Sequence, residues 1–452
     1  MGAESARSIL SGNGASPEIY TERSALDDLR PNQNAHQHFQ EYKHPDPRFD
    51  EVFRLLHAAA ERERYYSPLI TNGARDGRPQ ALLGASFPSD VAIRSAAELL
   101  LTRASVVNNR ESAWRDILAS YRLGRLVAMG PDLEDARLGM QVEQLSIAAV
   151  LKHIERYRPN STELLKCRED LGNMPAPSSV SDKVNLAERC KCLDSLMYLP
   201  WYMDKKSANF GSDLIWQGFG KIYQLVLEQG LREADWDPAL EEINQSFDET
   251  VRILNLANIN ERRKALDDWE RTWKVMRAPY TPPQRGEFSS LSPWEGTPEF
   301  LERMETLAWL RSRLDALAKP AGRSGKLDTE TESDAVREIG RATAAMMQPV
   351  YLRAFITEQR TRQSALNLEL ALGLAAFHAD HQRYPERLAD LEPKYLTTTP
   401  VDGFSGNALI YRLEDNGCLF YSVGENGRDD DGMLDRHGAD DLSVRMENST
   451  DQ

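Results

Sequence analysis

Apolar residues recur every three or four positions over most of this chain, which is the spacing of one face of an α-helix. The clearest stripe lies within residues 111–129 and includes Trp114, Ile117 and Tyr121. Because the links between such segments are short, we expect neighbouring helices to pack antiparallel. The pattern predicts helices at residues 50–66, 89–107, 111–129, 133–156, 161–171, 181–199, 212–233, 238–276 and 298–318.

Residues 113–126 place small and large side chains in the order that helix-turn-helix repeats use. No clear second copy follows at a spacing of about 34 residues. Repeat-like packing of the helical region therefore stays an open alternative.

Helix-breaking residues divide the chain into segments. Prolines and glycines interrupt the helical pattern over residues 279–298 and again at 320–325, where small polar residues favour a hinge. A helical pattern resumes near Thr329 and is expected to reach His381, with an interruption at Pro349. The predicted organisation is a mobile N-terminal arm at 1–50, a helical domain at 51–319, a hinge at 320–328, a connecting helix at 329–363 and a C-terminal unit at 364–446.

The C-terminal unit combines a helix, two short β-like runs and an acidic loop rich in glycine and aspartate. Its most distinctive segments are Arg383–Pro385, Pro400–Asp402, Phe404–Gly406, Tyr421–Gly427 and Asp429–Gly432. In this order they resemble the soluble headpiece of the major pseudopilin (pseudopilin G) of type II secretion systems. The resemblance implies a small α+β headpiece that is closed by a calcium-binding loop.

The layout of helices followed by this headpiece is similar to that of uncharacterised bacterial helical proteins, a resemblance that implies an architecture and no activity. The predicted fold is mainly α: a multi-helix domain, then a long helix, then the small α+β headpiece. A fragment that starts at about Thr329 is expected to fold by itself.

The acidic loop is the best candidate for chemistry. Between Glu425 and Asp441, seven carboxylates stand against two arginines in seventeen residues. So much like charge is costly unless a cation or solvent screens it, and calcium is the natural cation for oxygen ligands. An EF-hand is excluded, because placing Gly432 at loop position 6 puts glycines at positions 1 and 12.

The pseudopilin resemblance implies a ligand set for calcium, whereas a solvated acidic turn without metal is the alternative. In an extended segment Asp429 and Asp431 share one side, and Asp430 is expected to face away. The ligands implied are the carbonyl of Val423 and the side chains of Asn426, Asp429, Asp431, Asp440 and Asp441.

Composition and charge argue against several other classes of protein. A hydrophobic fraction of 41% with 28% charged residues is that of a folded protein, and a net charge of −15 argues against general nucleic-acid binding. No run of 18 apolar residues occurs, so we expect no membrane-spanning helix. The first residues lack the apolar core of a leader, whereas pseudopilins begin with a hydrophobic helix. Either the natural start is removed from this chain or the headpiece is used without a pilus.

Weaker metal candidates are more simply interpreted as ordinary structure. These are three histidines in the N-terminal arm, the helical pair His378 and His381, and the pair Cys190 and Cys192. With Cys167 and Cys418, the cysteines are too few and too scattered for a disulfide framework.

The sequence thus predicts a non-catalytic structural or binding module that works outside the cytoplasm, with a calcium-stabilised headpiece and an unidentified protein partner. The alternative is an enzyme of unknown class with its active site in the helical domain, beneath the loop at 279–298. The sequence contains no Gly-rich phosphate loop or other catalytic motif that would indicate the class of such an enzyme.

Overall fold

The computed structural model describes residues 47–66, 70–71, 82, 85–86, 90–202, 214–279, 298–318, 327–434 and 440–448. Most of the predicted arm, most of the predicted hinge and nearly all of the loop at 279–298 lie outside the described residues. So do the three histidines of the arm.

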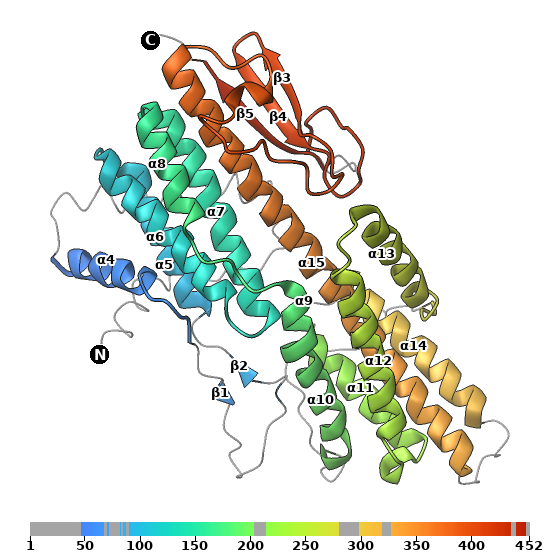
Figure 1. Cartoon of the computed structure of the whole chain (residues 1–452). Helices are drawn as coiled ribbons and strands as arrows, with labels where there is room; N and C mark the ends of the chain where they lie inside the picture. Colours follow the sequence, from blue (N-terminus) through green and yellow to red (C-terminus); the bar gives the residue numbers. More distant parts are fainter. Residues whose placement is uncertain are drawn as a thin grey trace, which may run out of the picture.

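The described chain is mainly helical, as predicted, with a small sheet near its C-terminus. Figure 1 shows the arrangement, in which a long helix, α15, runs diagonally through an elongated molecule. The helices are α4 (Pro47–Ala60), α5 (Asp90–Val106), α6 (Arg110–Ala128), α7 (Leu133–Tyr157), α8 (Ser161–Gly172), α9 (Val180–Lys183), α10 (Arg189–Tyr202), α11 (Leu214–Glu228), α12 (Asp237–Leu254), α13 (Ile259–Lys274), α14 (Pro298–Ala318) and α15 (Thr329–His381). A π-helix, Val184–Glu188, joins α9 to α10, and two short strands, β1 (Ile70–Thr71) and β2 (Ala85–Ser86), pair with each other.

Side-chain caps set several helix starts. Asn109 accepts a hydrogen bond from the N–H of Ser112 at the start of α6, and Asn160 forms a capping box with Glu163 at the start of α8. The helix predicted over 238–276 is wrong in its length, because the structure has two helices there. Asn258 accepts bonds from two N–H groups of the next turn and so starts α13 afresh.

Helix α15 is a single helix of 53 residues, which spans roughly 80 Å at 1.5 Å per residue. The predicted interruption at Pro349 is wrong, since the helix continues through it. Proline removes one backbone hydrogen bond at a cost of about 3 kcal/mol. Packing against α12 and α14 on this half of α15 outweighs that cost.

Two apolar cores lie along α15. The first joins its N-terminal half to α10, α11, α12 and α14, with Phe247 and Tyr351 fully buried and their rings 5.5 Å apart. The second joins its C-terminal half to α5, α6, α7, α8 and the sheet, with Leu370 and Leu374 fully buried. The long helix is therefore part of both cores.

Helices α6 and α7 approach closely where Gly124 and Gly139 meet. A Cβ atom at Gly139 would lie 2.6 Å from the carbonyl oxygen of Gly124. The absence of a side chain at both positions is what allows the two backbones to pack together.

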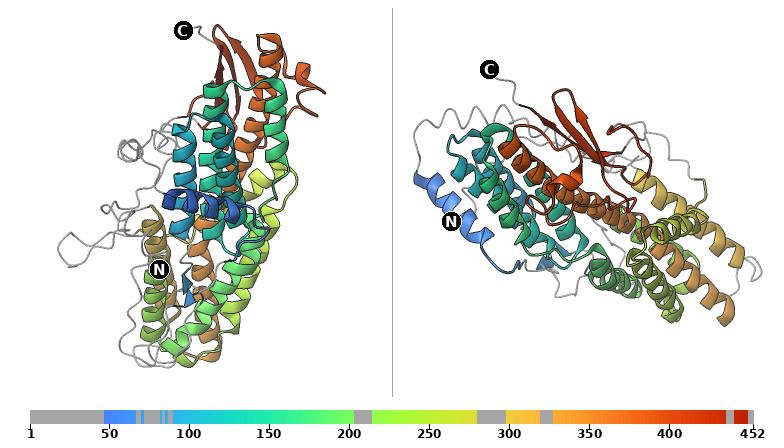
Figure 2. Two further views of the ribbon diagram at one scale, coloured as in Figure 1. Left: turned by 90° about the vertical axis from the view of Figure 1, so that its left-hand side faces the viewer. Right: turned by 45° about the horizontal axis from the view of Figure 1, so that its top comes forward.

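The headpiece sheet has the order β3 (Ile410–Glu414), β4 (Gly417–Ser422) and β5 (Leu442–Glu447), and both pairs are antiparallel. Figures 1 and 2 place it against the C-terminal half of α15, on the side away from α7. Every residue of β4 is buried. One face of β4 presents Cys418 and Phe420 to the second core, and the acidic loop covers Leu419 and Tyr421 on the other face.

Among the described helices, none combines the length and the apolar character that crossing a membrane requires.

We expect Gly139→Ala to lower the free energy of unfolding by about 1–3 kcal/mol, because the new methyl group overpacks a helix crossing. The matched control is Gly172→Ala in α8, where an added Cβ meets nothing within 4 Å. This control is expected to gain about 0.4–1 kcal/mol. Urea unfolding of both variants measures the difference, and equal effects would contradict the close approach of α6 and α7.

The shared second core changes what we expect of a fragment that starts at Thr329. The predicted boundaries of the helical domain, the hinge and the headpiece remain predictions. Without α7 and α8, however, the fragment would lose part of the second core, in which Leu370 and Leu374 are fully buried. We therefore expect no cooperative thermal transition from residues 329–452 alone, in contrast to the full chain. A cooperative transition of this fragment would show that the sheet and α15 suffice as a core.

Candidate metal centre

The acidic loop is anchored by a buried carboxylate just before the sheet. Asp402 is 2% exposed and accepts hydrogen bonds from four donors. Two are in its own turn, the N–H of Phe404 at 2.8 Å and the hydroxyl of Ser405 at 2.9 Å. Two are at the end of β4, the hydroxyl of Ser422 at 2.7 Å and the N–H of Val423 at 3.1 Å. Asp402 thus fixes the point where the acidic loop begins.

Two amide side chains of α15 form hydrogen bonds with the segments that lead into and out of the acidic loop. The Gln363 Oε1 atom accepts the N–H of Gly403 at 2.7 Å, and its Nε2 donates to Oδ1 of Asn367 at 2.8 Å. The Nδ2 atom of Asn367 donates to the carbonyl of Leu442 at 2.8 Å, where β5 begins. The entry and the exit of the acidic loop are therefore both tied to one helix.

Within the loop, two neighbouring aspartates receive backbone hydrogen bonds. The Asp440 Oδ2 atom accepts the N–H groups of Glu425 and Asn426 at 2.8 and 3.0 Å. The Asp441 Oδ2 atom accepts those of Asp430 and Gly432 at 3.0 and 2.8 Å. These bonds fold the two halves of the loop onto each other and leave the second oxygen of each carboxylate for other partners.

Three carboxylates meet in this loop. Asp430, Asp440 and Asp441 each offer an oxygen, and these oxygens lie within 4.8 Å of one another. Asp441 is 1% exposed, and the Oδ1 atoms of both Asp440 and Asp441 are buried and accept no hydrogen bond from the described residues. An opposing charge comes from Arg360, whose Nη1 lies 3.9 Å from Oδ2 of Asp440. Buried polar atoms normally have a partner, and a hard cation such as calcium is bound by carboxylate oxygens of this kind.

The structure brings together some of the predicted ligands and separates others. Asp440 and Asp441 lie in the cluster. Asp430, expected to face away, also lies in it. Asp429 instead accepts the hydroxyl of Tyr421 at 2.9 Å, and Asp431 is 77% exposed and pairs with an arginine of β3 at 3.2 Å.

The alternation argument for Asp429–Asp431 fails because the segment is a turn and not an extended strand. Asp431 has a positive φ of 59°, and the N–H of Met433 donates to the carbonyl of Asp430 at 3.1 Å. Gly432, at φ 74°, continues the turn, and a Cβ there would lie 3.2 Å from Tyr421. A glycine directly after three aspartates was the signal in the sequence that a turn, and hence Asp430, belonged in the site.

The two remaining predicted ligands lie at the edge of the cluster. Asn426 donates from Nδ2 to Oδ2 of Asp430 at 2.8 Å, so its amide group faces the carboxylates. Its Oδ1 accepts the N–H of Arg428 at 2.6 Å, so the amide would have to turn and give up that bond before its oxygen could bind an ion. Val423 precedes Gly424, where a Cβ would lie 2.4 Å from the carbonyl oxygen of Asp440, so the backbone near Val423 runs against the cluster.

Burial raises the pKa of the Asp441 carboxyl above its ordinary value. The hydrogen bonds that Asp441 accepts from two backbone N–H groups lower this pKa in part, whereas the negative charges of Asp430 and Asp429 raise it further. The charged form of Asp441 is therefore unfavourable in this loop unless a cation lies beside it.

The histidine pair on α15 does not converge on a common point. His378 lies against the ring of Tyr384, with ring centroids 4.7 Å apart, whereas Nε2 of His381 lies 3.1 Å from the hydroxyl of Tyr395. Burial lowers the pKa of His378. Both rings therefore act as packing and hydrogen-bonding groups at the end of the helix.

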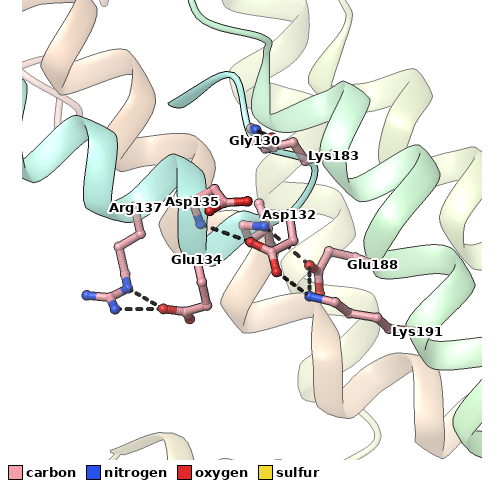
Figure 3. Close-up of polar contacts among 9 residues, drawn as sticks. Gly130, Asp132, Glu134, Asp135, Arg137, Lys183, Glu188 and Lys191 are labelled. Carbon is pink, nitrogen blue, oxygen red and sulfur yellow. Dashed lines mark hydrogen bonds and ion pairs between the residues drawn. The ribbon is translucent and has the colours of Figure 1, made fainter. Parts of the chain in front are cut away.

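A second group of buried charges lies where α7 begins, and Figure 3 shows its contacts. Lys191 donates to Asp132 at 2.9 Å and to Glu188 at 3.1 Å, while Lys183 donates to the carbonyl of Gly130. Burial raises the pKa of Glu188 and lowers that of Lys183. These charges are directed at one another and tie α7 to the π-helix and α10, so they give no support to an active site in the helical domain.

None of the protein-family models, curated proteins and solved structures compared with the chain matches it.

We expect Asp441→Asn to stabilise the protein at pH 7 in excess chelator. A carboxyl whose pKa is higher in the folded than in the unfolded chain stabilises the fold while protonated, and this contribution is lost as the pH rises through the folded pKa. Asparagine keeps an acceptor for the N–H groups of Asp430 and Gly432 and removes the buried charge. The gain in urea midpoint over the wild type should shrink as the pH falls toward 4. A variant less stable than the wild type in chelator at pH 7 would contradict the cost assigned to this charge.

Proposed function

We propose that this chain is a non-catalytic binding or structural module that acts outside the cytoplasm, and that its headpiece binds calcium. The observation that carries the proposal is the pair of buried oxygens, Oδ1 of Asp440 and Oδ1 of Asp441, which lack donors among the described residues and adjoin Asp430. The resemblance of the loop segments to the major pseudopilin headpiece supports the same conclusion.

Calcium suits this cluster better than magnesium does. Magnesium requires a small octahedral shell and keeps most of its waters, whereas calcium accepts six to eight oxygens in a flexible geometry. Here the proposed ligands are the carboxylates of Asp430, Asp440 and Asp441, with the Asn426 amide and the Val423 carbonyl as further oxygens nearby. We expect an affinity of about 10⁻⁴–10⁻³ M, as in extracellular calcium modules, and such a site would be filled only where calcium is abundant.

The role of the ion in this proposal is to hold the acidic loop over β4. Asp430 is in the middle of the loop, whereas Asp440 and Asp441 stand directly before β5. An ion bound by all three would crosslink the loop to the sheet. It would keep Gly432 against Leu419 and Tyr421, and so keep the outer face of β4 covered.

A protein partner is the second part of the proposal. Three large apolar side chains of the headpiece are at least half exposed: Val401 at 55%, Leu413 at 50% and Met433 at 54%. Exposed apolar side chains on a small unit favour contact with another protein when they gather in a patch. Met433 belongs to the acidic loop, so calcium would also hold this exposed apolar side chain in place.

Calcium is expected to raise the melting temperature of the full-length protein. For a dissociation constant of about 10⁻⁴–10⁻³ M, 10 mM calcium contributes about 1.4–2.7 kcal/mol by RT ln(1 + [L]/Kd). Asp430→Asn and Asp441→Asn should each remove most of the shift, and the exposed Asp431→Asn is the matched control that retains it. Differential scanning calorimetry in calcium, magnesium and chelator makes the comparison.

An unchanged melting curve between 10 mM calcium and excess chelator would overturn the metal site. Loss of the shift in Asp431→Asn with its retention in Asp430→Asn would instead favour the ligands implied by the resemblance. The shift should also fade as the pH falls through the raised pKa of Asp441, since the ion binds the charged carboxylate.

A further inference from the structure

An open cleft of about 540 Å³ lies between α12 and α13, with α15 as its floor. Helix α12 ends at Leu254 and α13 begins at Ile259, so both walls come from neighbouring segments of the chain. Its size lies within the range of about 300–1,000 Å³ that is usual for sites that bind small molecules. Nothing in the acidic loop lines this cleft.

The wall on α13 is aromatic. Trp269 and Trp273 are one helical turn apart, and their rings meet edge to face with centroids 6.3 Å apart. Trp269 is buried, whereas Trp273 is partly exposed and so presents part of its ring to the cleft. Such a pair offers a rigid apolar surface that costs little entropy to hold in place.

The opposite wall and the rim carry charges that are already paired. Arg341 binds Glu242 through two hydrogen bonds of 3.1 Å, and Arg252 binds Glu249 through two of 2.7 Å. Asp268 on α13 pairs with Arg271. The cleft therefore has almost no net charge to attract an ion.

Paired groups can still make further hydrogen bonds. A carboxylate accepts about four and a guanidinium donates up to five, and each pair uses only two. Gln245, which is exposed on α12, adds an amide that both donates and accepts. The wall opposite the indoles is thus rich in planar donors and acceptors without being ionic overall.

We propose that this cleft binds a neutral polyhydroxylated ligand, a carbohydrate of one to three rings. One face of a sugar ring consists of C–H groups, which pack on an indole by dispersion. Its hydroxyls both donate and accept, and so they match the paired charges and the Gln245 amide. The inference goes beyond the calcium site and does not depend on it.

Other ligand classes fit the cleft less well. A cation would be attracted to the indole faces but would also meet Arg252 and Arg341, and an anion would meet Glu242, Glu249 and Asp268. An apolar ligand would cover these groups without replacing their hydrogen bonds to water, which is costly. A neutral ligand with many hydroxyls avoids both penalties.

The test is titration calorimetry of the full-length protein, in excess chelator, with maltotriose, cellotriose and triacetylchitotriose. At least one of these neutral trisaccharides should give a saturable heat. Trp273→Ala should then weaken its binding at least tenfold, and Gln245→Ala by several fold. The matched control is Trp309→Ala on α14, a partly exposed tryptophan that does not line the cleft, which should bind as the wild type does.

The proposal is overturned if none of the three sugars binds, or if either Gln245→Ala or a folded Trp273→Ala binds like the wild type. It is also overturned if the charged trimers of glucosamine or galacturonic acid bind as tightly as the neutral ones. Because Gln245 is exposed, its variant should keep the wild-type circular dichroism spectrum and thermal transition. It therefore answers the question even if Trp273→Ala fails to fold.

Discussion

The fold depends on covering α15 along nearly its whole length. A helix of 53 residues that runs through two apolar cores cannot be stable alone in water with so many fully buried side chains. Helices α12 and α14 cover one half, and α7, α8 and the sheet cover the other. Removing either set would expose apolar surface worth roughly 25 cal/mol per Å². The sheet of the headpiece therefore forms one wall of the second core.

Buried polar side chains lie on α15 between the part of the helix in the first core and the part in the second. Glu358 accepts the N–H of Val180 at 3.1 Å, and Thr361 accepts the Gln144 amide at 3.2 Å. Gln363 and Asn367 then hold the turn before β3 and the start of β5. Each such group would cost about 1–3 kcal/mol if it were left without a partner. These side chains therefore specify which segments dock at each level of the helix, and apolar packing alone could not do this.

The two proposed sites are connected through α13. Arg263 near the start of this helix donates to the carbonyl of Phe404 at 3.1 Å, and a Cβ at Gly427 in the acidic loop would lie 2.7 Å from it. The same helix carries Trp269 and Trp273 into the cleft. The two sites differ in their electrostatics. The acidic loop gathers like charges that call for a cation, whereas the cleft pairs its charges and so suits a neutral ligand.

The sequence by itself determined most of the helices, because an apolar face repeats every 3.6 residues wherever a helix must pack. Local charge density identified the acidic loop, and the resemblance to the pseudopilin headpiece implied two of its three clustered carboxylates, Asp440 and Asp441. Tertiary structure decided the rest. Pro349 remains inside a helix because two neighbouring helices pack there, and Asp430 enters the cluster because a turn replaces the extended segment. The shared core under the sheet and the cleft beside Trp273 arise from contacts between residues far apart in the chain, which no local pattern records.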